Sequence, residues 1–135
     1  MFILLFVLLS SQISLADEAS SVFFGNLKEG QVIGTSYMVK MGVKRMAVAP
    51  AGEVKPGQGH HHLIIDGDFI PEGQVVPMDA THLHFGKGQT EAELLLTAGK
   101  HKVTLQFADG THKSYGKQMS ATVNIVVEND IKTLR

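Results

Sequence analysis

The sequence predicts an all-β protein, an immunoglobulin-like β-sandwich of about seven or eight short antiparallel strands. Three observations favour this class: apolar and polar residues alternate in short stretches, turn residues separate those stretches, and no long stretch has a helical period. The chain has 135 residues, enough to bury the core of one domain. It contains no cysteine, which excludes disulfides, thiol chemistry and cysteine-ligated zinc.

The N-terminal stretch predicts a secretory signal peptide over residues 1–16. An apolar run fills residues 1–9, and a small-x-small cleavage signal follows at residues 14–16. The run is shorter than the about 20 residues that a membrane span needs. We therefore expect an exported protein, periplasmic or secreted, with no membrane attachment after cleavage and a single β-sandwich domain over residues 17–135.

The strands follow from alternation and turn residues. After the first strand and a turn, an extended segment resumes up to Val32, and Gly42 is expected to separate the next two strands. The stretch 91–96 contains helix-favouring residues, but it is short and bounded by turn residues, so we predict a strand there. In chain order, the predicted strands are residues 21–24, 36–41, 45–49, 60–66, 82–85, 91–96, 101–107 and 121–128.

Five of the seven histidines lie in two short stretches, residues 59–66 and 81–86. Alternation along a strand places the two histidines of each H-x-H pair on one face, about 6.6 Å apart. If the two strands are neighbours, about 4.8 Å apart, four imidazoles converge on one patch. Neutral imidazole suits copper and zinc, so the pattern predicts a copper or zinc site. Its predicted ligands are His60, His62, His82 and His84.

The parity of the first stretch leaves one choice open. Leu63 and Ile65 share a face with His61, whereas His60 and His62 occupy the opposite face. Either face can point inward. We favour His60 and His62 as ligands because Leu63 and Ile65 match an apolar face better, and His61 remains the alternative.

Other residues near these stretches have weaker patterns. His112 lies in a loop shortly after the Asp-Gly turn and is a further candidate ligand, whereas His101 is expected to be an edge or core histidine. Asp66 and Asp79 either orient the ligand rings or satisfy local backbone N–H groups in their loops. The histidines themselves have an alternative interpretation, as polar side chains on a solvated strand face.

The function that follows is a metal carrier, buffer or sensor outside the cytoplasm. The alternative is an immunoglobulin-like interaction module without metal, docking on a periplasmic protein or a cell-wall glycan. The chain has neither a G-x-S-x-G nucleophile motif nor a phosphate-binding glycine loop, so catalysis would require an open metal site and ranks below binding. The net charge of -1 favours neither nucleic acid nor an anionic membrane.

The two histidine stretches, GHHHLIID at residues 59–66 and HLHFGKGQTE at residues 82–91, also carry a resemblance. Together with the stretches 46–52 and 96–112, they make the chain similar to a bacterial family of exported domains of unknown function. The resemblance covers nearly all of the chain after the leader. It implies a small periplasmic or secreted all-β domain, and it implies no activity, substrate or ligand.

Overall fold

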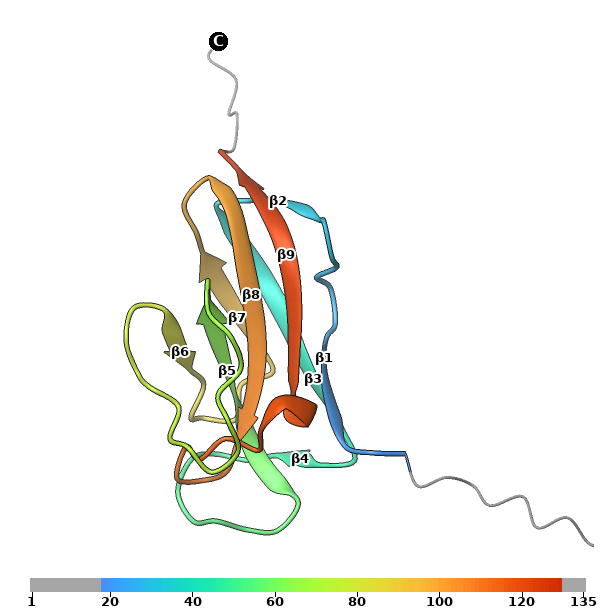
Figure 1. Ribbon diagram of the computed structural model, residues 1–135, viewed down its shortest axis with the longest axis vertical. Coiled ribbons are helices and arrows are strands. Elements are labelled where there is room, and N and C mark those ends of the chain that lie inside the picture. The colour runs from blue at the N-terminus through green and yellow to red at the C-terminus, as the bar shows by residue number, and fades with distance from the viewer. Residues whose placement is uncertain (1–17, 130–135) are drawn as a thin grey trace, which may run out of the picture.

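The computed structural model describes residues 18–129, and these residues form an all-β protein (Figure 1). The fold class expected from the sequence is confirmed at this level. The described part of the chain contains nine strands and one 3-10 turn. In chain order these are β1 (Ser21–Phe24), β2 (Val32–Gly34), β3 (Ser36–Lys44), β4 (Ala47–Val48), β5 (Gln58–Ile65), β6 (His82–His84), β7 (Glu91–Leu95), β8 (Gly99–Ala108), η1 (Lys117–Met119) and β9 (Ser120–Glu128).

The strands form two sheets in a sandwich-like arrangement. One sheet has three strands in the order β1-β3-β7, and the other has six, with the order β2-β9-β8-β5-β4 and β6 paired with β5. Figure 1 shows β8 and β9 in front of β3 and β7. Two pairings, β2 with β9 and β4 with β5, are parallel, which the expectation of purely antiparallel strands did not include.

The core lies between the two sheets. Val39 and Leu94 from the three-stranded sheet and Leu63, Leu105 and Phe107 from the six-stranded sheet are all at most 1% exposed. These residues alternate along their strands with residues of the opposite face, as the pattern of residues 101–107 predicted. Burial of this apolar surface is the main stabilising contribution in a chain without disulfides.

Strand β3 departs from the sequence expectation, because it runs through Gly42 without a break. Gly42 pairs with Phe23 of β1, and a Cβ at Gly42 would lie 2.2 Å from Cζ of that phenyl ring. The glycine therefore makes room for an aromatic ring from the neighbouring strand and does not end β3. The predicted strand at residues 91–96 is confirmed as β7, which pairs with β3.

The outer face of the six-stranded sheet is also covered, over the middle of β5 and β8. The connection between β5 and β6 lies over this face: Thr104 donates a hydrogen bond to the Gly67 carbonyl, and the Ile70 N–H donates to Gln106 Oε1. Thr104 and Gln106 are fully buried as a result. Because loops cover this face, polar side chains of β5 and β8 are held away from water.

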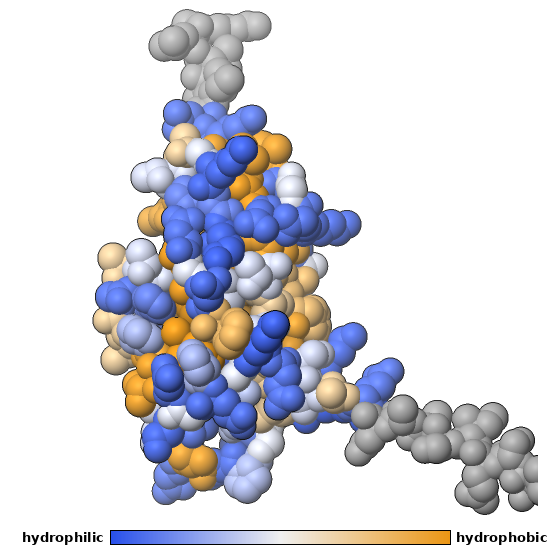
Figure 2. Space-filling model, viewed as in Figure 1, coloured by the Kyte–Doolittle hydropathy of each residue, from blue (hydrophilic) through white to orange (hydrophobic). Residues whose placement is uncertain are grey.

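The surface is mixed in character. Figure 2 shows hydrophilic residues over much of the face seen in Figure 1, interrupted by smaller apolar areas. Residues 18–129 contain no helix with the length and hydrophobicity that crossing a bilayer requires. The expected signal peptide, residues 1–16, lies outside the described residues.

Candidate metal centre

Four histidines converge on the outer face of the six-stranded sheet. One ring nitrogen from each lies within 4.8 Å of those of the other three. Ring centroids are 4.6 Å apart for His84 and His112 and 5.9 Å apart for His62 and His112, the extremes of the set. The four residues are His60 and His62 of β5, His84 of β6 and His112 of the loop after β8.

Strand pairing positions three of the four. His62 pairs directly with His84 across β5 and β6, so their side chains lie on the same face. His60 is two residues before His62 on β5 and shares that face. The expected neighbourhood of the two H-x-H strands is therefore confirmed.

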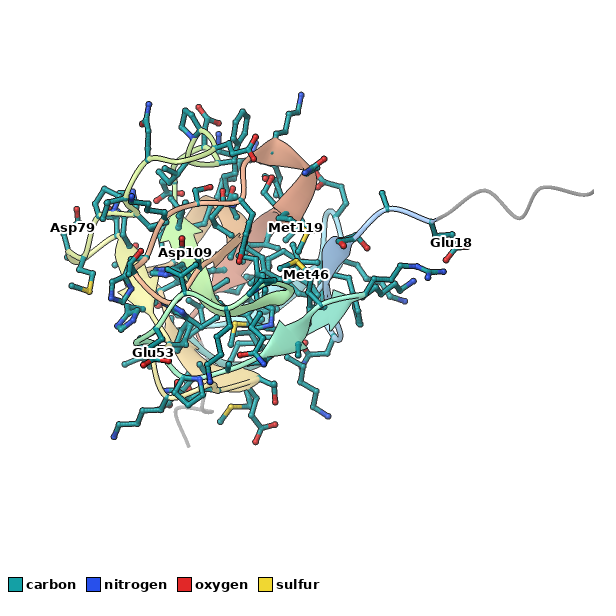
Figure 3. The ribbon with its side chains drawn as sticks, turned by 90° about the horizontal axis from the view of Figure 1, so that it is seen from below. Glu18, Met46, Glu53, Asp79, Asp109 and Met119 are labelled. Atoms are coloured by element: carbon teal, nitrogen blue, oxygen red, sulfur yellow. The ribbon has the colours of Figure 1, made fainter. Side chains whose placement is uncertain are left out.

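The fourth histidine of the cluster, His112, is positioned by a turn built on Asp109. The Asp109 carboxylate accepts hydrogen bonds from the Thr111 N–H and hydroxyl, each at 2.8 Å, and from the Lys113 N–H at 3.0 Å. His112 lies in the left-handed region, with φ of 68°, and its N–H donates to the Asp109 carbonyl. Its own carbonyl accepts from the Val76 N–H, which ties the loop to the β5–β6 connection. Asp79 and Asp109 lie on the side of the molecule away from Glu18 (Figure 3).

Two glycines make space for this arrangement. A Cβ at Gly86 would lie 2.3 Å from Cε1 and 2.5 Å from Nε2 of His84, so only glycine leaves room for that ring. A Cβ at Gly110 would lie 2.2 Å from the Glu53 carbonyl oxygen, so the turn before His112 packs directly on the loop between β4 and β5. Gly86 thus leaves room for the ring of His84, and Gly110 allows the turn before His112 to pack closely.

The distances suit one metal ion. Nε2 of His60 lies 3.0 Å from Nε2 of His62 and 3.1 Å from Nδ1 of His112. Imidazole nitrogens bound at about 2.0–2.1 Å to a tetrahedral ion are about 3.3 Å apart, so the observed separations are close to those of a shared ion. Nε2 of His84 is buried and has no hydrogen-bond partner, which leaves its lone pair or proton unsatisfied. The residues present therefore fit a metal ion.

Burial lowers the pKa values of three of the four imidazoles, those of His60, His62 and His84. Burial, reinforced by the neighbouring histidines, lowers the pKa of His60 from 6.5 to about 4. For the same reasons the pKa of His62 falls to about 3, and that of His84 is also lowered. Neutral imidazole is the form that binds a metal, so protons do not compete for these rings near neutral pH.

The alternative of a solvated histidine face is wrong for the middle of the cluster. His60 and His62 are both 0% exposed. The Nε2 atoms of both rings have only histidine nitrogens as hydrogen-bond partners. Their Nδ1 atoms are buried and have no partner. Burying unpaired polar atoms costs about 1–3 kcal/mol each, so this burial needs a compensating interaction.

Two sequence candidates lie outside the cluster. His82 lies two residues before His84 on β6 and pairs with Ile64 of β5. Its Nδ1 lies 2.8 Å from the Asp79 carboxylate. The structure does not bring it into the group of four clustered histidines, because that local contact holds its ring. His61 points to the inner face, with its ring centroid 5.0 Å from that of Phe107. It is a core residue, as its parity with Leu63 indicated.

The remaining expectations concern His101, Asp66 and Asp79. Nδ1 of His101 lies 2.9 Å from the Asp66 carboxylate and its Nε2 lies 2.8 Å from the Thr97 carbonyl, so this ring is satisfied locally and does not join the cluster. Asp79 accepts the backbone N–H groups of Thr81 and His82, so it organises its own loop. Neither aspartate contacts the cluster through a hydrogen bond.

The supporting roles of Asp109 and Gly86 were not apparent from the sequence. The signal for Asp109 was the spacing of an aspartate two residues before a threonine, which is typical of turns in which the carboxylate accepts nearby N–H groups. Gly86 directly follows the predicted strand 82–85, a position where glycine ordinarily ends a strand. Its contact with His84 depends on the ring orientation, which alternation does not specify.

Comparison with known proteins gives a family without a function. The family model of DUF4399, a domain of unknown function, matches residues 39–128, a stretch that contains all four histidines. Neither the curated proteins nor the solved structures provide a match. Because the family model covers more than half of the chain, the protein belongs to the DUF4399 family.

Proposed function

We propose that the protein binds one transition-metal ion, copper or zinc, through His60, His62, His84 and His112, and acts as a carrier, buffer or sensor of that metal. The observation that carries this proposal is the approach of four ring nitrogens to within 4.8 Å of one another. The burial of two of the rings and the unpaired Nε2 of His84 support it.

The donor set favours copper or zinc over harder cations. The group of potential ligands contains four histidines and no carboxylate. Magnesium and calcium prefer oxygen ligands, whereas imidazole nitrogen suits zinc and Cu(II). Four nitrogens in a tetrahedral arrangement favour zinc, and a flatter arrangement favours Cu(II).

The number of ligands favours binding over catalysis. A catalytic zinc site keeps one coordination position for water or substrate, whereas structural and storage sites fill all four with protein atoms. Four histidines would fill that shell, and their ring nitrogens lie within 4.8 Å of one another. The proposed role is therefore to hold the ion.

The proposed scaffold is immunoglobulin-like, and the proposed location is the periplasm or the exterior. The strand orders β1-β3-β7 and β9-β8-β5 support this scaffold, because they match by analogy the A-B-E and G-F-C orders of the immunoglobulin fold. The apolar run and cleavage signal in residues 1–16 support export.

The test is metal titration of the untagged protein, residues 17–135. We expect Cu(II) or Zn(II) to bind with one ion per chain in calorimetry, and the variant with alanine at all four histidines to bind none. His101→Ala is the control, because it removes a histidine that lies outside the cluster and is held by the Asp66 carboxylate. Binding that survives the fourfold substitution would disprove the assignment. No binding by the parent protein would favour the interaction module instead.

A further inference from the structure

The metal centre has a gradient of exposure across its ligands. His60 and His62 are completely buried on β5, whereas His84 and His112 are partly exposed. An ion therefore has to reach the cluster from the side formed by β6 and the loop after β8. A ligand that receives the ion from solvent is expected on that side.

His82 is placed for such a role. It lies two residues from His84 on the same strand, and both residues pair with β5, His84 with His62 and His82 with Ile64. Alternation puts His82 and His84 on one face, with Cα atoms about 6.6 Å apart. The side chain of His82 is 20% exposed, so water reaches it.

Asp79 holds the ring of His82 in place. The carboxylate lies 2.8 Å from Nδ1 and is itself held by the N–H groups of Thr81, at 2.9 Å, and His82, at 3.0 Å. A carboxylate acceptor at Nδ1 orients the ring and favours the tautomer with its proton on Nδ1, which leaves the lone pair on Nε2 for a metal. Among residues 18–129, no hydrogen-bond partner of His82 Nε2 is found.

His101 provides the contrast within the same chain. Its Nδ1 also meets a carboxylate, that of Asp66 at 2.9 Å, but its Nε2 lies 2.8 Å from the Thr97 carbonyl. Both nitrogens are engaged, so this imidazole has no free lone pair to offer. A carboxylate-bound histidine with an open nitrogen next to the cluster is the distinctive feature of His82.

We propose that His82 is an entry ligand, which binds the ion from solvent through Nε2 and passes it along β6 to His84. Transfer is a ligand exchange: a metal–nitrogen bond forms at His84 as the bond at His82 breaks, and the oxidation state of the ion does not change. From His84 the ion reaches the buried nitrogens of His60 and His62. This inference rests on the metal binding proposed above.

The role has a kinetic signature that separates it from ordinary ligation. A residue on the path that is absent from the final ligand set lowers the barrier for uptake and release equally, and leaves the dissociation constant unchanged. A residue of the final set, by contrast, stabilises the bound state, so its loss raises the dissociation constant mainly through faster release.

The experiment is stopped-flow mixing of metal-free protein with Cu(II), followed by release to an excess of chelator. The chain has two tyrosines and no tryptophan, so quenching of tyrosine fluorescence reports binding. We expect His82→Ala to slow uptake and release severalfold by the same factor, with an unchanged dissociation constant. Asp79→Asn, which no longer fixes the tautomer through a carboxylate, should slow both rates less, and His101→Ala should change neither.

Two results would overturn the proposal. One is uptake by His82→Ala and Asp79→Asn at the parent rate, with folding verified by circular dichroism. The other is a raised dissociation constant for His82→Ala at an unchanged uptake rate, which would make His82 a ligand of the bound state. Failure of the proposed function is distinguishable, because the parent protein would then bind no Cu(II) in the same titration.

Discussion

Nε2 of His62 lies 3.0 Å from Nε2 of His60, and both side chains are completely shielded from solvent. Two imidazole nitrogens at this distance either share a proton or coordinate one ion. The two residues lie two positions apart on strand β5 and share one face of it, so the sheet holds both in place. This pair is the rigid half of the proposed centre, and His84 and His112 are added to it from neighbouring segments.

Substitution of a buried ligand should therefore have the largest effect on affinity. Replacing even a residue that only supports a ligand costs about 10–100-fold in metal affinity, so we expect His62→Ala to weaken Cu(II) or Zn(II) binding by more than about a hundredfold. Calorimetric titration measures this change. Equal affinities for His62→Ala and the His101→Ala control would contradict the assignment of His62.

Asp109 should matter for affinity although it provides no ligand atom. Its carboxylate accepts three hydrogen bonds that shape the turn before and around His112. We expect Asp109→Ala to weaken metal binding about 10–100-fold. Asp109→Asn keeps the accepting oxygen and should lose less. Asp79→Ala is the control at equilibrium, since Asp79 organises a different loop, and parent-like affinity of Asp109→Ala would exclude the positioning role.

Gly86→Ala tests the space around His84. The added Cβ would approach the ring to 2.3 Å, so the imidazole has to rotate or shift away from the other ligands. We expect weaker metal binding with a smaller change in the unfolding free energy. Gly25→Ala is a suitable control, because its nearest neighbour would be Cβ of Lys40 at 3.1 Å, far from any cluster histidine. Identical metal affinities of the two variants would refute this account.

We expect His61 to lower the free energy of unfolding and to bind no metal. Both of its ring nitrogens are buried without a hydrogen-bond partner, and its ring packs against Phe107 in the core. A buried polar group without a partner costs about 1–3 kcal/mol, so we expect His61→Leu to raise the free energy of unfolding by an amount of that order. Urea denaturation provides the value. Metal affinity should be unchanged, and its loss would make His61 a ligand.

The metal-free protein should lose stability in mild acid. The pKa values of His60 and His61 are lowered from 6.5 to about 4, mainly by burial, and that of His62 falls to about 3. Between pH 6.5 and about pH 4 the unfolded chain binds more protons than the folded chain. The free energy of unfolding therefore falls as the pH decreases through this window. Above 6.5 both states are neutral at these sites and the contribution is flat. Urea denaturation at a series of pH values measures the slope, and His61→Leu should reduce it. A constant stability over the window would show that these rings are not buried in solution.

Much of the centre could be predicted from strand alternation. The parity of His60 and His62 against Leu63 and Ile65 is a local property, because side chains of a strand alternate between its faces whatever it packs against. The same logic selected His84 as a ligand. Alternation does not predict the pairing of β5 with β6, since strand order depends on contacts between distant parts of the chain.

The exchange of His82 for His112 was not predictable for a physical reason. Strand β6 has only three residues, and Nδ1 of His82 is hydrogen-bonded to the carboxylate of Asp79 in the preceding turn. His112 reaches the cluster through a backbone φ of 68° in a loop, where no periodic pattern exists to indicate its direction. The complete burial of His60 and His62 likewise depends on a loop that folds over the sheet.

The four imidazoles occupy the outward side of the larger sheet, whereas the apolar interior that stabilises the sandwich lies on its inward side. Donor atoms can therefore be exchanged without repacking the interior. This separation makes the domain a convenient framework for metalloprotein engineering, in which cysteine, methionine or carboxylate donors at the same four positions would retune ion preference or redox behaviour on an unchanged scaffold.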